Sequence, residues 1–173
     1  MNKKLLDAMK NEQPLQVVGT INAYSSLLAK KAGFKAIYLS GAGVANYSFG
    51  LPDLAMTTLN DVCEDVRRIT YACDLPLIVD ADTGWGNTFM ISRVIKELQR
   101  AGASGCHIED QVSSKRCGHR PGKELVSSSE MNERIKAAMD ARVRDFSIIA
   151  RTDALATEGL EATIERAHSY IES

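Results

Sequence analysis

Short apolar runs alternate with longer segments of helical periodicity along the whole chain. The apolar runs are continuous rather than alternating, as in strands covered on both faces, and they fall at residues 17–19, 36–39, 77–79, 105–108 and 147–150. Apolar residues at helical spacing predict helices over residues 25–31, 58–73, 88–100, 128–139 and 161–173, with Ser128 or Ser129 as the N-cap of the fourth. Gly33 and Gly102 follow two of these helices, where glycine commonly terminates a helix.

This alternation predicts an α/β protein with a parallel sheet and right-handed crossovers. Five strand–helix units in 173 residues average about 35 residues each, and eight such units would fill the usual length of a closed (β/α)8 barrel. We therefore expect a TIM-type barrel of which residues 1–173 supply about the first five units. The chain stops inside a predicted helix, so we expect it to be a single, truncated domain.

Composition and charge narrow the class of protein. The chain is 45% hydrophobic and 25% charged, which is typical of globular proteins and excludes disordered and coiled-coil chains. The net charge of -1 gives no basic surface for nucleic acid. No apolar run approaches the roughly 20 residues of a membrane span, and we see no secretory signal. We expect a cytoplasmic protein with a small-molecule partner, and neither nucleic acid nor membrane as a partner.

The four cysteines are Cys63, Cys73, Cys106 and Cys117, and none forms a Cys-x-x-Cys pair. A zinc ribbon or a thioredoxin-type site is therefore not expected. In a reducing compartment all four should be free thiols, with three of them buried as small apolar residues. Cys117 differs because cationic residues surround it in the sequence.

Polar residues follow four of the predicted strands. They are Ser40-Gly41-Ala42-Gly43, the pair Asp80 and Asp82 with the segment 83–86, the pair Glu109 and Asp110, and Arg151-Thr152-Asp153. In parallel α/β sheets the carboxyl ends of the strands carry the functional site. We therefore expect these groups to converge.

Asp80 and Asp82 alternate along one strand end, so their side chains can point the same way. Two such carboxylates suit Mg²⁺, which prefers oxygen ligands and keeps several waters, and Glu109 could join them. An Asx-turn with a salt bridge is the alternative. The small residues 40–43 allow backbone N–H groups to approach a carboxylate-sized anion, or they form only a tight turn.

The segment Lys115-Arg116-Cys117-Gly118-His119 lies in a loop of about 18 residues, long enough to be functional. Cationic neighbours favour a thiolate, so Cys117 could carry a proton or act as a nucleophile. A solvated basic loop with an incidental cysteine is the alternative. We expect Trp85 at the rim of the site.

The remaining two histidines have other surroundings. His107 lies inside an apolar strand, where a hydrogen-bonded core histidine is the favoured interpretation. His168 falls on the last predicted helix, where we expect it to be solvated.

Six segments together resemble the isocitrate lyase/phosphoenolpyruvate mutase superfamily. They stand in order at residues 38–44, 50–53, 79–86, 107–111, 115–119 and 150–154, and the likeness covers nearly the whole chain. The Lys-Arg-Cys-Gly-His loop is specific to the lyase branch of that family. Arg116, where isocitrate lyases more usually have lysine, favours the branch that acts on the methylated acid in the methylcitrate cycle of propionate catabolism.

The resemblance implies cleavage of 2-methylisocitrate to pyruvate and succinate by a Mg²⁺-dependent lyase, with Mn²⁺ as a possible substitute. By position, Asp80 and Asp82 would hold the metal, Cys117 would protonate the succinate carbanion and Arg151 would pair with a carboxylate. The substrate would also contact Ser40, Gly41, Ala42, Asp80 and Gly118. The supporting residues would be His119, Tyr38, Glu109, Asp53, Lys115, Arg116 and Trp85.

Ala42 departs mildly from the family pattern, where glycine is common. Family members also continue through three more strands to a C-terminal helix exchanged within a homotetramer. Two alternative activities belong to the same superfamily. The protein could be an isocitrate lyase, or it could be a relative of the phosphonomutases or oxaloacetate decarboxylases. An alternative of another class is an inactive remnant that binds only Mg²⁺ and a dicarboxylate, or a partner chain.

Overall fold

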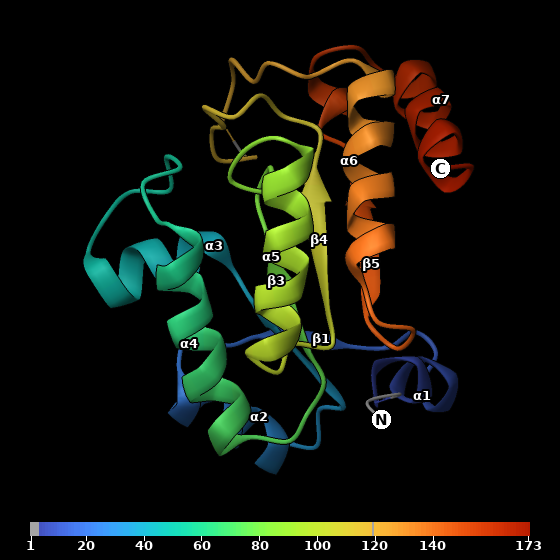
Figure 1. Cartoon of the computed structure of the whole chain (residues 1–173). Coiled ribbons are helices and arrows are strands. Elements are labelled where there is room, and N and C mark those ends of the chain that lie inside the picture. Colours follow the sequence, from blue (N-terminus) through green and yellow to red (C-terminus); the bar gives the residue numbers. More distant parts are fainter. Residues whose placement is uncertain (1–3, 119) are drawn as a thin grey trace.

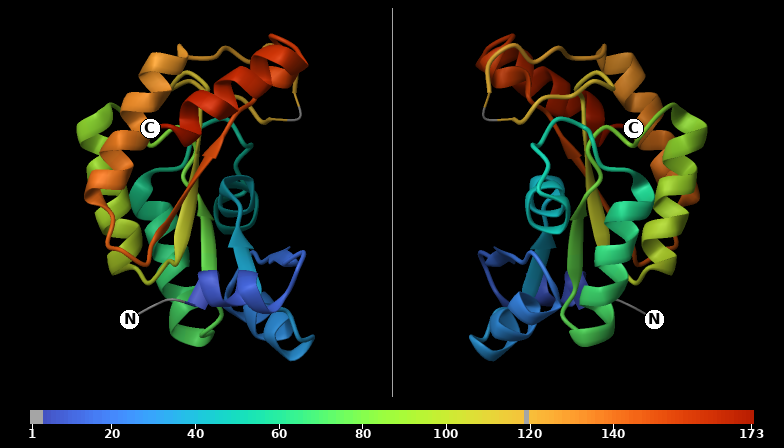
Figure 2. Two further views of the ribbon diagram at one scale, coloured as in Figure 1. Left: turned by 90° about the vertical axis from the view of Figure 1, so that its right-hand side faces the viewer. Right: turned by 90° about the vertical axis from the view of Figure 1, so that its left-hand side faces the viewer.

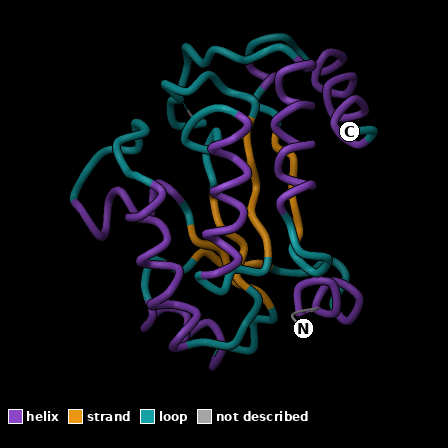
Figure 3. The backbone as a smooth tube through the Cα atoms, viewed as in Figure 1, coloured by secondary structure: helices purple, strands orange, loops and turns teal. Residues whose placement is uncertain are grey.

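The computed structural model describes residues 4–118 and 120–173, and its centre is a parallel sheet of five strands (Figures 1 and 3). The strands lie in the order of the sequence: β1 (Val17–Gly19), β2 (Ala36–Leu39), β3 (Leu77–Asp80), β4 (Gly105–Glu109) and β5 (Ser147–Arg151). The predicted strands and their parallel arrangement are therefore confirmed. This order is typical of successive units of a β/α barrel.

Helices connect the strands as the apolar periodicity predicts. They are α1 (Lys4–Asn11), α2 (Ala23–Lys31), α4 (Leu59–Ala72), α5 (Thr88–Arg100), α6 (Ser128–Ala141) and α7 (Leu160–Ile171). Short turns complete the list: α3 (Gly41–Gly43), the π-helical η1 (Val44–Ser48) and the 3-10 turn η2 (Ala154–Ala156). No helix of the described ranges is both long and apolar enough to cross a bilayer.

One local expectation needs correction. The N-cap of α6 is Ser127 rather than Ser128 or Ser129, because the extended Ser127 accepts the Glu130 backbone N–H at 3.1 Å on its own Oγ. The sequence pattern assigns no helix to the segment of α3 and η1, where residues 40–43 predict an anion-binding segment or a tight turn. Gly33 and Gly102 do terminate their helices, with φ angles of +96° and +100°.

The two faces of the sheet carry different residues. One face packs against α4, α5 and α6, which lie side by side in Figure 2. The side chains that fill this core alternate along the strands and are fully buried: Ile37, Leu39, Leu77, Val79, Cys106 and Ile108. Because side chains alternate across a strand, the intervening positions point to the other face, and they are Tyr38, Asp80, His107, Glu109 and Arg151. The alternation thus separates the core from the functional residues.

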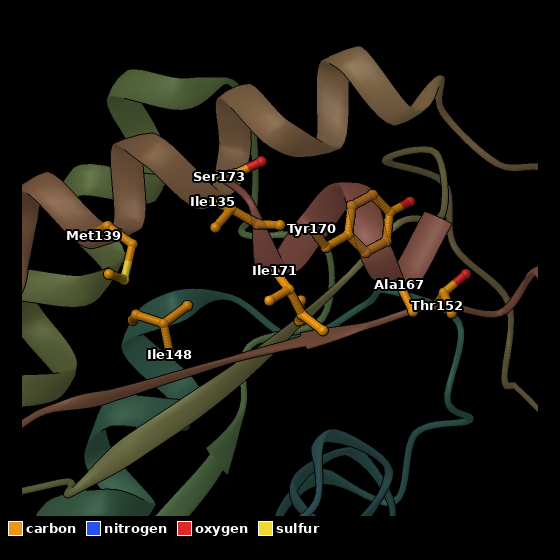
Figure 4. A pocket seen from close by; sticks show the side chains of 9 residues that line it. Ile135, Met139, Ile148, Thr152, Ala167, Tyr170, Ile171 and Ser173 are labelled. Atoms are coloured by element: carbon orange, nitrogen blue, oxygen red, sulfur yellow. The ribbon is translucent and has the colours of Figure 1, made fainter. Parts of the chain in front are cut away.

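The second face is only partly covered in this chain. Ile149 on β5 and Val17 on β1 are each 39% exposed, although both were expected in strands covered on both sides. On the helical side, a groove of about 360 Å³ runs between α6, β5 and α7, and it is mainly apolar (Figure 4). Ile148 and Met139 lie on one side of it, and Tyr170 and Ile171 lie on the other.

Candidate active site

Asp80 and Asp82 converge at the carboxyl end of β3, as predicted. Asp80 Oδ2 accepts the Gly41 N–H at 3.1 Å, and Asp80 Oδ1 accepts the Asp82 N–H at 3.1 Å. Asp82 has a φ of 46°, a left-handed conformation that turns the chain directly after the strand. A Cβ on Gly41 would lie 3.2 Å from Asp82 Oδ1 and 3.3 Å from Asp80 Oδ2, so both carboxylates lie against the same glycine.

Lys115 joins two carboxylates from different loops. Its Nζ lies 2.8 Å from Asp82 Oδ1 and 2.5 Å from Asp53 Oδ1, and its side chain is almost fully buried. Burial and the charge of Asp80 raise the pKa of Asp82 to about 6, and the Lys115 ammonium partly offsets this effect. Burial alone would lower the pKa of Lys115, but Asp82 and Asp53 outweigh it and the pKa is raised. Lys115 thus contacts both Asp53 and Asp82, and the supporting roles of Asp53 and Lys115 stay predictions.

Tyr38 and His107 form a stacked pair beside Asp80. The Tyr38 hydroxyl lies 2.7 Å from His107 Nε2, the two ring centroids are 5.6 Å apart, and Nε2 is 3.5 Å from Asp80 Oδ1. Burial lowers the pKa of His107, with Asp80 acting in the opposite direction. His107 is buried as expected but belongs to the site rather than to the apolar core. Its alternation with Glu109 along β4 was the signal that could have identified it.

The pKa of Asp80 shows which form of this carboxyl the site favours. Burial alone would raise this pKa, but His107, the two backbone N–H groups and Lys115 together lower it. Tyr38 responds in the opposite sense, since burial and the Asp80 charge raise the pKa of its hydroxyl. These surroundings therefore favour the ionised form of Asp80 and the protonated form of Tyr38.

Arg151 lies between two carboxylates at the end of β5. Its Nη1 is 3.2 Å from Glu109 Oε2 and its Nη2 is 3.2 Å from both oxygens of Asp153. Burial raises the pKa of Glu109 to about 8, although the Arg151 charge lowers it. The second oxygen of Glu109, Oε1, is buried without a hydrogen-bond partner. About a third of the Arg151 side chain stays exposed, so its guanidinium can still receive a carboxylate.

The loop that carries Cys117 covers Arg151. Cys117 is half-buried, whereas the other three cysteines are buried free thiols as predicted. A Cβ on Gly118 would overlap Arg151 Nη2, so the loop backbone lies directly against the guanidinium. Lys123, which sequence reasoning missed, donates to the Gly118 carbonyl at 2.7 Å. The prediction for His119 lies outside the described residues.

The remaining predicted residues occupy the rim. Trp85 donates from Nε1 to the Thr57 carbonyl at 2.9 Å, and it lines a cavity of about 220 Å³ together with Asp82 and Lys115. Ser40 stands at the start of α3, its hydroxyl makes no capping hydrogen bond, and Ala42 follows on the same turn. The Gly41 N–H is engaged by Asp80, so Gly41 orients a carboxylate of this chain. The contacts of these three residues with a substrate stay predictions.

The donor set fits a hard divalent cation. Asp80, Asp82 and the unpartnered Glu109 Oε1 are all carboxylates, which Mg²⁺ and Mn²⁺ prefer. The described residues contain no ready-made group of three His, Cys, Asp or Glu ligands. Mg²⁺ usually keeps several waters and takes only one or two carboxylates from the protein, so such a group is not required.

Fold and site together define a class: a β/α barrel-type protein with an acidic, cation-compatible site at the carboxyl ends of its strands. The chain belongs to the phosphoenolpyruvate phosphomutase family, whose sequence model matches residues 5–173. It is 62% identical to a 2-methylisocitrate lyase of Shewanella oneidensis over 95% of this chain, and 60% identical to that of Escherichia coli over 96%. The expected superfamily is therefore confirmed.

Solved structures share the fold. Oxaloacetate acetylhydrolase superposes with a TM-score of 0.92 at 40% identity, covering 98% of this chain and 59% of that chain. 2,3-Dimethylmalate lyase gives a TM-score of 0.90 at 37% identity, with 99% and 60% covered. The chain spans 56% of the Shewanella relative and 57% of the Escherichia relative, so it corresponds to little more than half of either protein.

Proposed function

We propose that the protein carrying this chain is a carbon–carbon lyase that cleaves 2-methylisocitrate to pyruvate and succinate in propionate catabolism. The observation that carries the proposal is the contact between the Cys117 loop and Arg151, at the same carboxyl edge of the sheet as the Asp80–Asp82 pair. It supports a site in which Cys117 is an acid, Arg151 binds a carboxylate and the two aspartates hold a cation. The 62% identity to a 2-methylisocitrate lyase supports the same substrate.

The charges of the reaction match these groups. When a carboxylate of the site accepts the proton of the substrate hydroxyl, the carbon–carbon bond breaks, a keto group forms on pyruvate and the electron pair stays on the succinate carbon. A bound Mg²⁺, held by Asp80 and Asp82, would supply positive charge at the hydroxy-acid end, where the keto oxygen develops. Arg151 binds a substrate carboxylate through its planar fork. Cys117 then transfers its thiol proton to the succinate carbanion.

The buried ammonium of Lys115 supports the site without contacting the substrate. It holds Asp82 and Asp53 together at the base of the loop that also carries Cys117. Trp85 and Lys115 line the cavity beside Asp82, and a bound substrate that displaces water from this cavity would strengthen the electrostatic contacts there. Tyr38 and His107 keep Asp80 oriented through a hydrogen-bonded stack.

Substrate turnover by the natural gene product tests the proposal. The purified protein is incubated with Mg²⁺ and, in parallel, with 2-methylisocitrate, isocitrate or oxaloacetate, and the products are identified by mass spectrometry. We expect pyruvate and succinate from 2-methylisocitrate at the highest kcat/KM, and loss of turnover in EDTA that Mg²⁺ or Mn²⁺ restores. Preference for isocitrate or oxaloacetate would reassign the substrate. Mg²⁺ binding without any turnover would favour a non-catalytic protein.

The proposed function also implies an oligomeric state and a cellular location for the protein. We propose a cytoplasmic homo-oligomer, a tetramer by analogy with the family. Light scattering of the natural gene product measures its mass in solution, and a monomer would contradict this part.

A further inference from the structure

Gln111 is a buried polar residue at the root of the Cys117 loop, and the mechanism above does not use it. It lies two residues beyond Glu109, the last residue of β4, and is only 1% exposed. An isolated bridge pairs it with Leu125, so the loop between them leaves and rejoins the fold at this point. A buried amide must satisfy its hydrogen bonds, because an unpaired one costs folding free energy. Its partners therefore indicate what it holds.

The side-chain amide binds the backbone of Arg116 in both directions. Gln111 Oε1 accepts the Arg116 N–H at 3.0 Å, and Gln111 Nε2 donates to the Arg116 carbonyl at 3.0 Å. The carbonyl carbon of Arg116 is bonded to the backbone nitrogen of Cys117. The Arg116 N–H belongs to the peptide group on the other side of Arg116, so the two hydrogen bonds fix the backbone on both sides of the residue that precedes Cys117, although the Arg116 side chain itself is exposed.

The same Nε2 reaches the opposite side of the site. It donates to Asp153 Oδ2 at 2.8 Å, and Asp153 also receives Arg151 Nη2 at 3.2 Å on each oxygen. One amide thus connects the backbone at Cys117 to the carboxylate that orients Arg151. A glutamine is suited to this task because it offers a donor and an acceptor on one rigid plane.

We propose that Gln111 is a positioning residue that fixes the backbone before Cys117 relative to Arg151, so that the thiol and the guanidinium address the same substrate. This inference rests on the proposed lyase function. Gln111 touches neither substrate nor reacting atoms in this scheme and acts through Arg116 and Asp153. The proton transfer from Cys117 depends on its geometry, so release of the loop should lower turnover more than substrate binding.

Two variants of the natural gene product remove the contacts in steps. Gln111→Met keeps the length and burial of the side chain but removes all three hydrogen bonds. Gln111→Glu keeps the acceptor for the Arg116 N–H and removes both donated bonds. We expect kcat of Gln111→Met to fall about 10²-fold, the effect of a misplacement of about 1 Å. KM should change far less, because Arg151 keeps its contacts with Glu109 and Asp153.

Gln99 provides a matched control at the other end of the sheet. It also binds backbone in both directions, from Nε2 to the Ala141 carbonyl at 3.3 Å and from the Val143 N–H at 2.5 Å, and it is remote from the carboxyl ends of the strands. Gln99→Met should lower the thermal unfolding temperature without lowering kcat. An equal loss of kcat in Gln99→Met and Gln111→Met would contradict a positioning role, because it would indicate a general loss of stability.

Alkylation of Cys117 gives a readout that does not need turnover. The rate of iodoacetamide labelling is followed by mass spectrometry of the peptide that contains Cys117, in the absence of substrate. We expect Gln111→Met to increase this rate, because the Arg116 backbone loses its two hydrogen bonds to the side chain of residue 111. Gln99→Met should leave the rate unchanged. Unchanged kcat and an unchanged labelling rate in Gln111→Met would overturn the proposal.

The two proposals fail in distinguishable ways. If the wild-type protein does not cleave 2-methylisocitrate, the proposed function fails, and the labelling rates still decide whether Gln111 holds the loop. If the wild type is active and Gln111→Met matches it, only the inference about Gln111 fails.

Discussion

The backbone of Gly118 lies against the guanidinium of Arg151, with no room for a side chain between them. A Cβ at this position would overlap Arg151 Nη2 and would also come within 3.4 Å of Asp153 Oδ1. Arg151 cannot move away easily, because Glu109 and Asp153 hold it from two sides. The glycine therefore decides how closely the Cys117 loop approaches the strand end.

Gly118→Ala should separate the loop from Arg151. The added methyl group must displace either the loop backbone that follows Cys117 or the guanidinium, and we expect kcat/KM for 2-methylisocitrate to fall about 10²-fold. Steady-state kinetics of the natural gene product measure this change. Gly33→Ala, between α2 and the start of β2, is the control: a Cβ there meets nothing within 4 Å, but its φ of +96° strains any substituted residue, so this variant should lose stability without losing kcat/KM. Equal activity of Gly118→Ala and Gly33→Ala would contradict the close approach.

Cys117→Ser should preserve the fold and lose catalysis. The thiol is half-buried and free, and a serine hydroxyl occupies similar space but is a much weaker acid. We expect kcat to fall at least about 10²-fold, the lower end for a positioned general acid. Circular dichroism checks the fold, and product analysis checks turnover. Near-normal turnover would remove Cys117 from the mechanism.

Asp80→Asn should weaken Mg²⁺ binding. Loss of a residue that only hydrogen-bonds to a metal ligand typically weakens metal binding by about 10- to 100-fold. Titration calorimetry with MgCl2 should show a larger loss of affinity for Asp80→Asn, because Asp80 is expected to bind the metal directly. Asp65→Asn is a suitable control, since Asp65 is 5% exposed and binds Ser48 and Arg68 instead. If both variants bind Mg²⁺ as tightly as the wild type, Asp80 is not a ligand.

The ion pair of Glu158 and Arg166 predicts a pH dependence of stability. Two bonds of 2.6 and 2.7 Å join the carboxylate to the guanidinium on α7, and the hydrogen bonds from Arg166 hold the pKa of Glu158 below its usual value. The pair therefore stabilises the fold above the unfolded pKa of Glu, about 4.3, and this contribution disappears as the pH falls through the lower folded pKa.

Glu158→Gln isolates this contribution. Near neutral pH the variant should unfold at a temperature lower by at most about 4 °C, because the carboxylate is largely solvent-exposed. As the pH falls through the lowered pKa of Glu158, the difference from wild type should shrink and then vanish, since the wild-type carboxyl becomes protonated as well. Calorimetric scans across this range provide the measurement. A difference that persists in acid would show that packing rather than charge is lost.

Much of the fold could be predicted because its signal is local. The apolar runs and the helical periodicity depend only on neighbouring residues, and all five predicted strands lie within one or two residues of β1–β5. The local pattern assigned no helix to residues 41–48, which form helical turns although they contain two glycines. Gly41 there lies close to Asp80 and Asp82, and its N–H donates to Asp80.

The sequence by itself determined the sheet, its parallel order and the chemistry at its carboxyl edge, because strand boundaries and residue types depend only on neighbouring residues. Tertiary structure alone decided which groups meet. His107 and Tyr38 are 69 positions apart, Lys115 and Asp53 are 62 apart, and Gln111 and Asp153 are 42 apart. No local pattern encodes such pairs, because each depends on the register of neighbouring strands and on the path of a long loop. The packing of five successive units brings them within hydrogen-bond distance.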